Sequence, residues 1–164
     1  MRGRAAAPAA GTVLNALANH TGSAFAIDEM ITAEVELGSD DVTGEIAGHQ
    51  AADTRLIERC VSLTATRYGD GQGGHVRTES EVPMAAGLKS SSAAANATVL
   101  ATLDALGISI GDGGVSRETA ARLGVTAARE VGVTVTGAFD DASASMLGGV
   151  TVTDNDADLL LSHE

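Results

Sequence analysis

The chain has 164 residues and a formal net charge of −12, from 22 acidic and 10 basic side chains, and only 2% of its residues are aromatic. This length is sufficient for one hydrophobic core, which must be packed from Ala, Val, Leu and Ile. The negative charge repels phosphate backbones and anionic lipids, so neither nucleic acid nor a membrane is an expected partner. One lysine against nine arginines indicates a protein kept soluble in concentrated salt, with an ordinary acidic protein as the alternative.

The single cysteine excludes an intramolecular disulfide and favours a reducing compartment. Cys60 falls on a predicted helix face with Leu56, Ile57 and Val61, which is typical of a core residue rather than a nucleophile. No window approaches 18 uninterrupted apolar residues, so no membrane span is predicted. We therefore expect a cytoplasmic protein; the composition does not indicate its oligomeric state.

Hydrophobic periodicity divides the first half of the chain into short elements. The apolar stretch 11–20 fits a strand or a helix, and alternation over 23–37 predicts a half-buried strand pair. Residues 38–50 have the composition of a surface connection or hairpin, and Asp53 begins a predicted helix that extends to about Arg67. Residues 69–74 match G-x-G-x-x-G but follow a helix and precede a strand, an order that indicates a turn rather than a dinucleotide site.

The second half contains more helix. A strand over 75–82 is followed by an Ala-rich helix from Ser91 to about Leu106, and a second helix runs from Ser116 to about Val131. A stretch of small residues then leads to a last strand at 150–153 and an acidic tail. This order of elements predicts an α+β fold with a mixed or antiparallel sheet covered on one face by helices.

The run from Pro83 to Ala93 is the strongest functional signal. It contains the only lysine, Lys89, followed by three serines at the start of a predicted helix. A helix cap needs a single serine, whereas these residues supply an ammonium group and several N–H and O–H donors to one point. We predict a phosphate site, in which a serine hydroxyl could also ligate a magnesium ion. The run lacks the glycines of a Walker loop.

Two acidic features follow the second long helix. Asp140 and Asp141 form a carboxylate pair after a Gly-Ala-Phe turn, and such a pair beside a phosphate loop suits a kinase, where an aspartate orients or deprotonates an alcohol. The alternative is a solvated acidic loop. Glu130, at the end of the helix, is either a magnesium ligand or a surface residue. The four histidines show no metal-ligand spacing.

The segment Pro83-x-x-x-Gly87-Leu88-x-Ser90-Ser91-x-Ala93 resembles the second motif of the GHMP kinases. Lys89 stands where most members have glycine, and a lysine before three serines resembles the archaeal shikimate kinase branch. The runs 7–16 and 134–142 are similar to the same branch and occur in the same order. The resemblance extends from about Gly3 to Val152.

The resemblance implies ATP-dependent phosphorylation of shikimate to shikimate 3-phosphate, with ATP and Mg²⁺ as cofactors. Asp140 and Lys89 are then the catalytic residues, and Ser91 and Glu130 the metal ligands. It also implies that the nucleotide is held by Pro83, Met84, Ala85, Ala86, Gly87, Leu88, Lys89, Ser90, Ser91, Ser92 and Ala93. Four residues lie in stretches that resemble the substrate side, with turn caps as the alternative: Thr12, Asn15, His20 and Asp28.

The implied fold is that of ribosomal protein S5 domain 2, over residues 1–153. Residues 154–164 are then the beginning of a connection to a ferredoxin-like domain that the chain lacks. Two alternatives remain: another alcohol acceptor, homoserine or mevalonate, and a binding module of the same fold without catalysis. Such a module needs a basic face to bind nucleic acid, which nine scattered arginines do not make.

Overall fold

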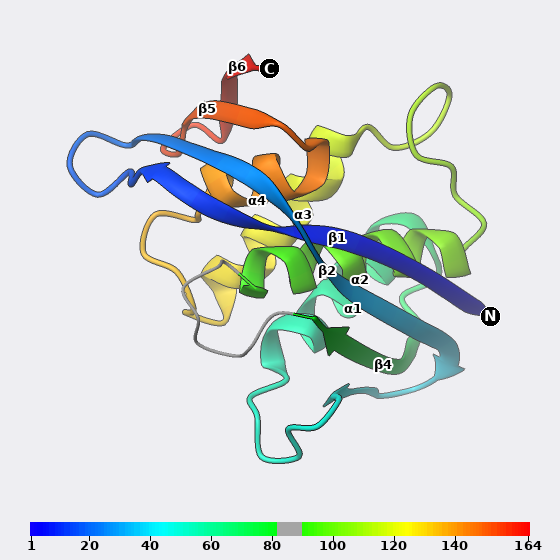
Figure 1. Ribbon diagram of the computed structural model, residues 1–164. Coiled ribbons are helices and arrows are strands. Elements are labelled where there is room, and N and C mark those ends of the chain that lie inside the picture. Colours follow the sequence, from blue (N-terminus) through cyan, green and yellow to red (C-terminus); the bar gives the residue numbers. More distant parts are fainter. Residues whose placement is uncertain (82–89) are drawn as a thin grey trace.

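The computed structural model describes residues 1–81 and 90–164 (Figure 1). Within them the elements follow in the order β1 (Arg2–Leu14), β2 (Thr21–Ser39), β3 (Val42–Ile46), α1 (Arg55–Tyr68), β4 (Gly73–Ser80), α2 (Ser90–Ala105), α3 (Arg117–Glu130), α4 (Phe139–Leu147), β5 (Val150–Asp154) and β6 (Leu159–His163).

Strand β2 is the centre of the sheet. It has 19 residues, of which those within 23–36 pair with β1 along one edge. Along the other edge, its residues 31–39 pair with β4 and its residues 21–25 pair with β5. All these pairings are antiparallel; β3 lies parallel to β4, and β6 lies antiparallel to β5. One long strand therefore holds together two parts of the sheet that are distant in sequence.

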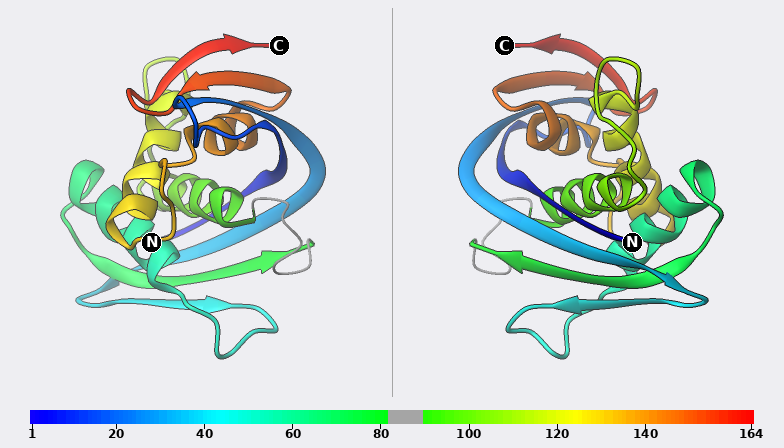
Figure 2. Two further views of the ribbon diagram at one scale, coloured as in Figure 1. Left: turned by 90° about the vertical axis from the view of Figure 1, so that its left-hand side faces the viewer. Right: turned by 90° about the vertical axis from the view of Figure 1, so that its right-hand side faces the viewer.

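The sheet curls around the helices, which lie on its concave face (Figure 2). Helix α2 is buried on nearly all sides because it packs against strands β1 and β2 and against the three other described helices. Its abundant alanines allow close approach. At Gly3 on β1, an added Cβ atom would overlap the carbonyl oxygen of Ala101 in α2, so the strand backbone rests directly on the helix.

The core has two main parts. One lies among the helices and includes Leu103, Val125 and Phe139, and the other lies between the sheet and helices α1 and α2 and includes Val61 and Val76. These side chains are almost wholly buried. With aromatic residues nearly absent, close packing of small aliphatic groups replaces large rings.

The structure confirms the α+β prediction and the predicted helices that became α1, α2 and α3, with bounds shifted by one or two residues. Other predictions were wrong. Residues 23–37 form part of one strand, not a pair, because the partner strand β1 precedes them. Residues 42–46, predicted to lie in a surface connection or hairpin, form strand β3, which pairs in parallel with β4, and the small-residue stretch contains helix α4.

Residues 159–163 of the acidic tail form strand β6 at an edge of the sheet, and the backbone of Glu164 exchanges two hydrogen bonds with Val150. This segment therefore continues the sheet. In the ranges 1–81 and 90–164, no helix is long and apolar enough to span a membrane.

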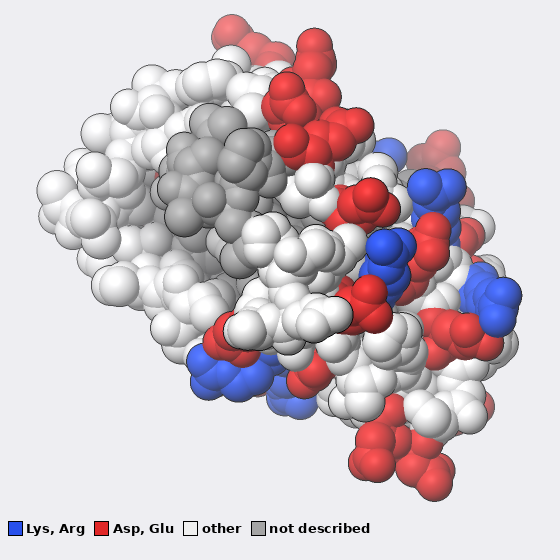
Figure 3. All heavy atoms as spheres, turned by 60° about the horizontal axis from the view of Figure 1, so that its bottom comes forward, with Lys and Arg blue, Asp and Glu red and all other residues white. Residues whose placement is uncertain are grey.

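Charged side chains are unevenly spread on the face shown in Figure 3. They gather over one half of it, whereas the half that carries the β1–β2 hairpin is mostly uncharged. The exposed apolar side chains of this hairpin include Val13, Leu14 and Leu17.

Candidate active site

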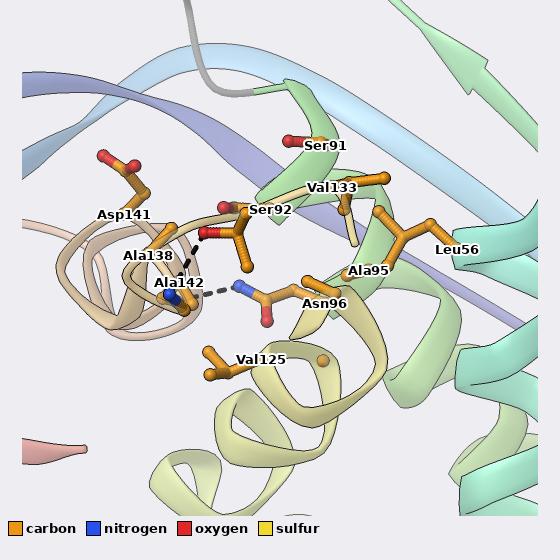
Figure 4. A pocket seen from close by; sticks show the side chains of 14 residues that line it. Leu56, Ser91, Ser92, Ala95, Asn96, Val125, Val133, Ala138, Asp141 and Ala142 are labelled. Atoms are coloured by element: carbon orange, nitrogen blue, oxygen red, sulfur yellow. Dashed lines mark hydrogen bonds between the residues drawn. The ribbon is translucent and has the colours of Figure 1, made fainter. Parts of the chain in front are cut away.

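A cavity of about 140 Å³ opens between the first turn of α2, helix α3, the loop 132–138 and the start of α4 (Figure 4). Leu56 of helix α1 closes one side. The polar side chains that line the cavity come from three separate parts of the chain: Ser91, Ser92, Asn96, Thr134 and Asp141.

The first turn of α2 presents hydrogen-bond donors to the cavity. Ser91 is exposed and Ser92 is partly buried, and this turn contains no acidic residue. The unpaired N–H groups at a helix start carry a partial positive charge, and the two hydroxyls add further donors. A phosphate group placed here would be bound by backbone and side chain together.

The loop before α4 turns the chain sharply back toward α2. Gly137 and Ala138 both have left-handed backbones, with φ of 86° and 51°. The hydroxyl of Thr134 accepts a hydrogen bond from the Gly137 N–H at 3.1 Å, and that of Thr136 accepts one from the Ala138 N–H at 3.3 Å. The turn directs the start of α4, which carries both aspartates, toward the serines of α2.

The two aspartates point in different directions. Asp141 lines the cavity, and the hydroxyl of Thr12 on β1 donates a hydrogen bond to its carboxylate at 3.4 Å. Asp140 is not among the lining residues; its carboxylate is buried and accepts a hydrogen bond from the side chain of Asn155 at 2.8 Å. The side chain predicted to act on the alcohol therefore faces the interior, and its neighbour faces the cavity.

Asn96 fixes the spacing between the serines and Asp141. Its amide nitrogen donates to the carbonyl oxygen of Ala142 at 2.9 Å, which ties α2 to the first turn of α4. On the other side, Gly124 lets α3 approach α2, since an added Cβ atom would lie 3.2 Å from the Cβ of Ala95. Both walls of the cavity are thus anchored to α2.

Glu130 lies outside the cavity. Its carboxylate forms an ion pair with Arg59 of α1, and both side chains are about two-fifths exposed. This arrangement agrees with the alternative of a surface residue rather than with a magnesium ligand.

The donors in the cavity fit Mg²⁺ only together with a nucleotide. Ser91 and Asp141 offer the hard oxygen atoms that Mg²⁺ prefers. Within the described ranges, however, no three His, Cys, Asp or Glu side chains form a cluster that could hold a metal by themselves. A site of this kind takes most of its ligands from phosphates and water.

Part of the predicted nucleotide site, Pro83 to Lys89, lies outside the described residues. Of the remaining three serines and one alanine, Ser91 and Ser92 line the cavity, whereas Ala93 is buried below it. Among the predicted substrate-side residues, Thr12 reaches Asp141. Asn15 accepts a hydrogen bond from the Leu17 N–H within the β1–β2 turn, as in the turn-cap alternative.

A second hollow, of about 200 Å³, adjoins the cavity and shares Leu56, Ser91 and Val133 with it. Its walls are mostly apolar, with Ile46 and Ile57 from β3 and α1. Local sequence patterns predicted neither this hollow nor the hydrogen bonds of Asn96 and Asn155. The segments that meet there are far apart in the chain, and single asparagines give no pattern.

The curled sheet with its helices on one face defines an α+β domain in which a helix start opens into a polar cavity. The chain belongs to the GHMP kinase family: the model of the GHMP kinases N terminal domain matches residues 55–149. The structure is similar to the crystal structure of the Methanococcus jannaschii mevalonate kinase, with a TM-score of 0.77 and 14% identity. That match covers 100% of this chain and 56% of the other.

Two curated relatives have a higher sequence identity to this chain than the mevalonate kinase has. A shikimate kinase of Halobacterium salinarum is 70% identical over 166 residues, which is all of this chain and 57% of the Halobacterium protein. A shikimate kinase of Methanosarcina mazei is 54% identical and matches all of this chain and 55% of its own length. The chain thus spans a little over half the length of these relatives.

Proposed function

We propose that the protein carrying this chain is a shikimate kinase, which transfers the γ-phosphoryl group of ATP to a hydroxyl of shikimate. The observation that carries this proposal is the shared cavity: Ser91 and Ser92 at a helix start lie on one side and Asp141 on another. The 70% identity to the Halobacterium shikimate kinase favours this alcohol over homoserine or mevalonate. A cytoplasmic location belongs to the same proposal.

The first turn of α2 binds the phosphate end of the nucleotide. Its N–H groups and the hydroxyls of Ser91 and Ser92 stabilise the charge that develops on the transferred group. When bound, Mg²⁺ would neutralise negative charge on the nucleotide phosphates, and the hydroxyl of Ser91, which lines the cavity, would help to hold it. The adjoining apolar hollow has room for the base. Lys89, outside the described residues, remains the predicted cation of this site.

Asp141 acts on the acceptor alcohol. Its carboxylate accepts the hydrogen bond of the attacking hydroxyl, orients the oxygen toward the phosphorus and takes the proton as the bond forms. The Thr12 hydroxyl steadies this carboxylate from the opposite wall. The role that the family resemblance implied for Asp140 is therefore proposed for Asp141.

The substrate is tested by a coupled assay of ADP release from the full-length protein with shikimate, homoserine and mevalonate. We expect turnover with shikimate alone, confirmed by isolation of shikimate 3-phosphate. ADP release with homoserine or mevalonate at equal kcat/KM would assign a different acceptor. No alcohol-dependent ADP release would leave the binding module as the better account.

Asp141→Asn removes the base but keeps the shape of the side chain. We expect kcat to fall by about 10²- to 10⁴-fold, because a positioned general base contributes on this order.

Lys89→Ala should lower kcat by about 10²-fold through loss of charge stabilisation. Asp70→Asn, on an exposed loop, is the matched control and should leave kcat unchanged. Equal activity of Asp141→Asn and the control would remove Asp141 from the mechanism.

A further inference from the structure

Asn155, in the turn between β5 and β6, joins several elements behind the cavity. Its side chain is 1% exposed, and its amide oxygen accepts hydrogen bonds from the Asp140 N–H at 3.2 Å and from the Thr153 hydroxyl at 2.6 Å. Its amide nitrogen donates to the Asp140 carboxylate at 2.8 Å. Asn155 thus holds both the backbone and the side chain of Asp140.

Asp140 is enclosed from other directions as well. Its carbonyl oxygen accepts hydrogen bonds from the hydroxyls of Ser143 at 3.0 Å and Thr151 at 3.2 Å. Gly22 of β2 lies against the carboxyl group: a Cβ atom added there would lie 2.7 Å from the Asp140 carboxyl carbon. A buried carboxylate costs free energy unless it is hydrogen-bonded. The carboxylate of Asp140 is therefore held in the one position where Asn155 donates to it.

Arg129 of α3 extends the same network. Its guanidinium donates to the carbonyl oxygens of Asn155 at 3.0 Å and Thr136 at 3.2 Å, and it forms a two-pronged ion pair with Asp158. The loop before α4 and the turn after β5 are therefore held by one side chain. The rotation of α4 about its axis is fixed by groups on β2, β5, α3 and this turn.

We propose that Asp140 and Asn155 are positioning residues for phosphoryl transfer. They hold the first turn of α4 so that Asp141, the next residue round the helix, faces the cavity. Asp140 itself takes no proton. This inference rests on the proposed function, because it assigns Asp141 the chemical role.

Two substitutions separate the effect of the shape of Asp140 from the effect of its charge. Asp140→Asn retains an oxygen that accepts from Asn155, whereas Asp140→Ala and Asn155→Ala remove one partner of the pair. We expect kcat for Asp140→Asn to stay within about threefold of the wild type. The two alanine variants should lose about 10²-fold in kcat with smaller changes in KM, because a displaced catalytic group costs about this much. Thr102→Val, which removes a buried hydroxyl at the far end of α2, controls for general destabilisation and should keep full kcat.

Hydrogen exchange in the full-length protein gives a readout independent of activity. Amides of α4 should exchange faster in Asp140→Ala and Asn155→Ala than in Asp140→Asn or Thr102→Val. Equal loss of kcat in Asp140→Asn and Asp140→Ala would overturn the proposal, since the charge of Asp140 would then act in the reaction. Unchanged kcat and exchange in the alanine variants would also overturn it. If shikimate is not a substrate, the proposed function fails while the exchange comparison still decides the positioning role.

Discussion

Asp140 and Asp141 are neighbours in the chain and both are buried, at 4% and 3% exposed, yet their carboxylates have different surroundings. The first is enclosed by Gly22 and Asn155, and the second lines the cavity opposite the serines of α2. A helix rotates successive side chains by about 100°, so the two carboxylates point in different directions. The sequence predicted that a carboxylate acts here, but its motif alone did not settle which of the two would line the cavity.

Cys60 illustrates a second effect at the scale of the residue. Burial raises the pKa of its thiol to about 12, because the surrounding core disfavours the thiolate. In the unfolded chain the thiol ionises near its ordinary value of about 9. Unfolding therefore releases a proton between about pH 9 and 12, and the stability contributed by Cys60 is lost as the pH rises through this window.

We predict that the difference in the free energy of unfolding between the wild type and Cys60→Ala, here called the stability gap, narrows above pH 9. Below pH 9 the wild type should be more stable, because the substitution leaves a small cavity. Above it, the free energy of unfolding of the wild type should fall relative to the variant by up to about 1.4 kcal/mol per pH unit. Urea denaturation followed by circular dichroism at pH 7.5, 9 and 10.5 measures the gap. A gap that is constant with pH would show that the folded thiol titrates normally.

At the scale of elements, the structure depends on close backbone approach between β1 and α2. The strand lies on the helix at Gly3 and the helix presents alanines to it, so both sides of the contact are small. The same helix carries the serines at its start and Asn96 in its second turn. The position of the first turn of α2 is therefore fixed by packing in the core.

Gly3→Ala tests this contact. The added Cβ atom would meet the backbone of Ala101 and Ala105, and backbone cannot move aside as a flexible side chain can. We expect a loss of about 1–3 kcal/mol in the free energy of unfolding, as for other overpacked cores. Gly107→Ala is the comparison: its Cβ would meet nothing within 4 Å, but its φ of +71° costs about 1 kcal/mol. Thermal denaturation of both variants measures the difference, and a Gly3→Ala protein as stable as the wild type would contradict the packing described.

At the scale of the whole molecule, electrostatic repulsion among the acidic side chains opposes folding. Most arginines are already paired with carboxylates, as in the pairs of Arg2 with Glu36 and Arg77 with Glu45, and 22 acidic residues against 10 basic ones leave a large excess. Exposed pairs contribute little stability each. Their screening by salt therefore costs little stability, while salt also screens the repulsion among the excess acidic side chains.

We expect the melting temperature to rise as KCl increases from 0.1 to 1 M and then to level off. Over this range the screening length falls from about 10 to about 3 Å, which removes most of the repulsion between surface carboxylates. Differential scanning calorimetry at pH 7 measures the change. Sucrose at matched osmolality is the control, because it stabilises by exclusion without screening. A melting temperature that falls with KCl would mean that the ion pairs outweigh the repulsion.

Local patterns in the sequence predicted three helices, the α+β class and the serine turn, because amphipathic spacing, caps and helix breakers act over a few residues. They did not predict α4, whose run of alanine, serine and methionine shows no clear period, or the single long strand β2. Nor did they reveal β6 as part of the sheet. These features depend on partners far away in the chain.

The sequence by itself determined the chemistry available to this protein: the helix start rich in hydroxyls, the paired aspartates, and an acidic surface built almost without lysine. Only the tertiary structure decided that Asp141 and not Asp140 lines the cavity, that Glu130 pairs with Arg59, and that Asn155 holds the buried Asp140. The physical reason is that orientation and burial are set by contacts between separate segments of the chain, which lie 129 residues apart for Thr12 and Asp141 and 71 apart for Arg59 and Glu130.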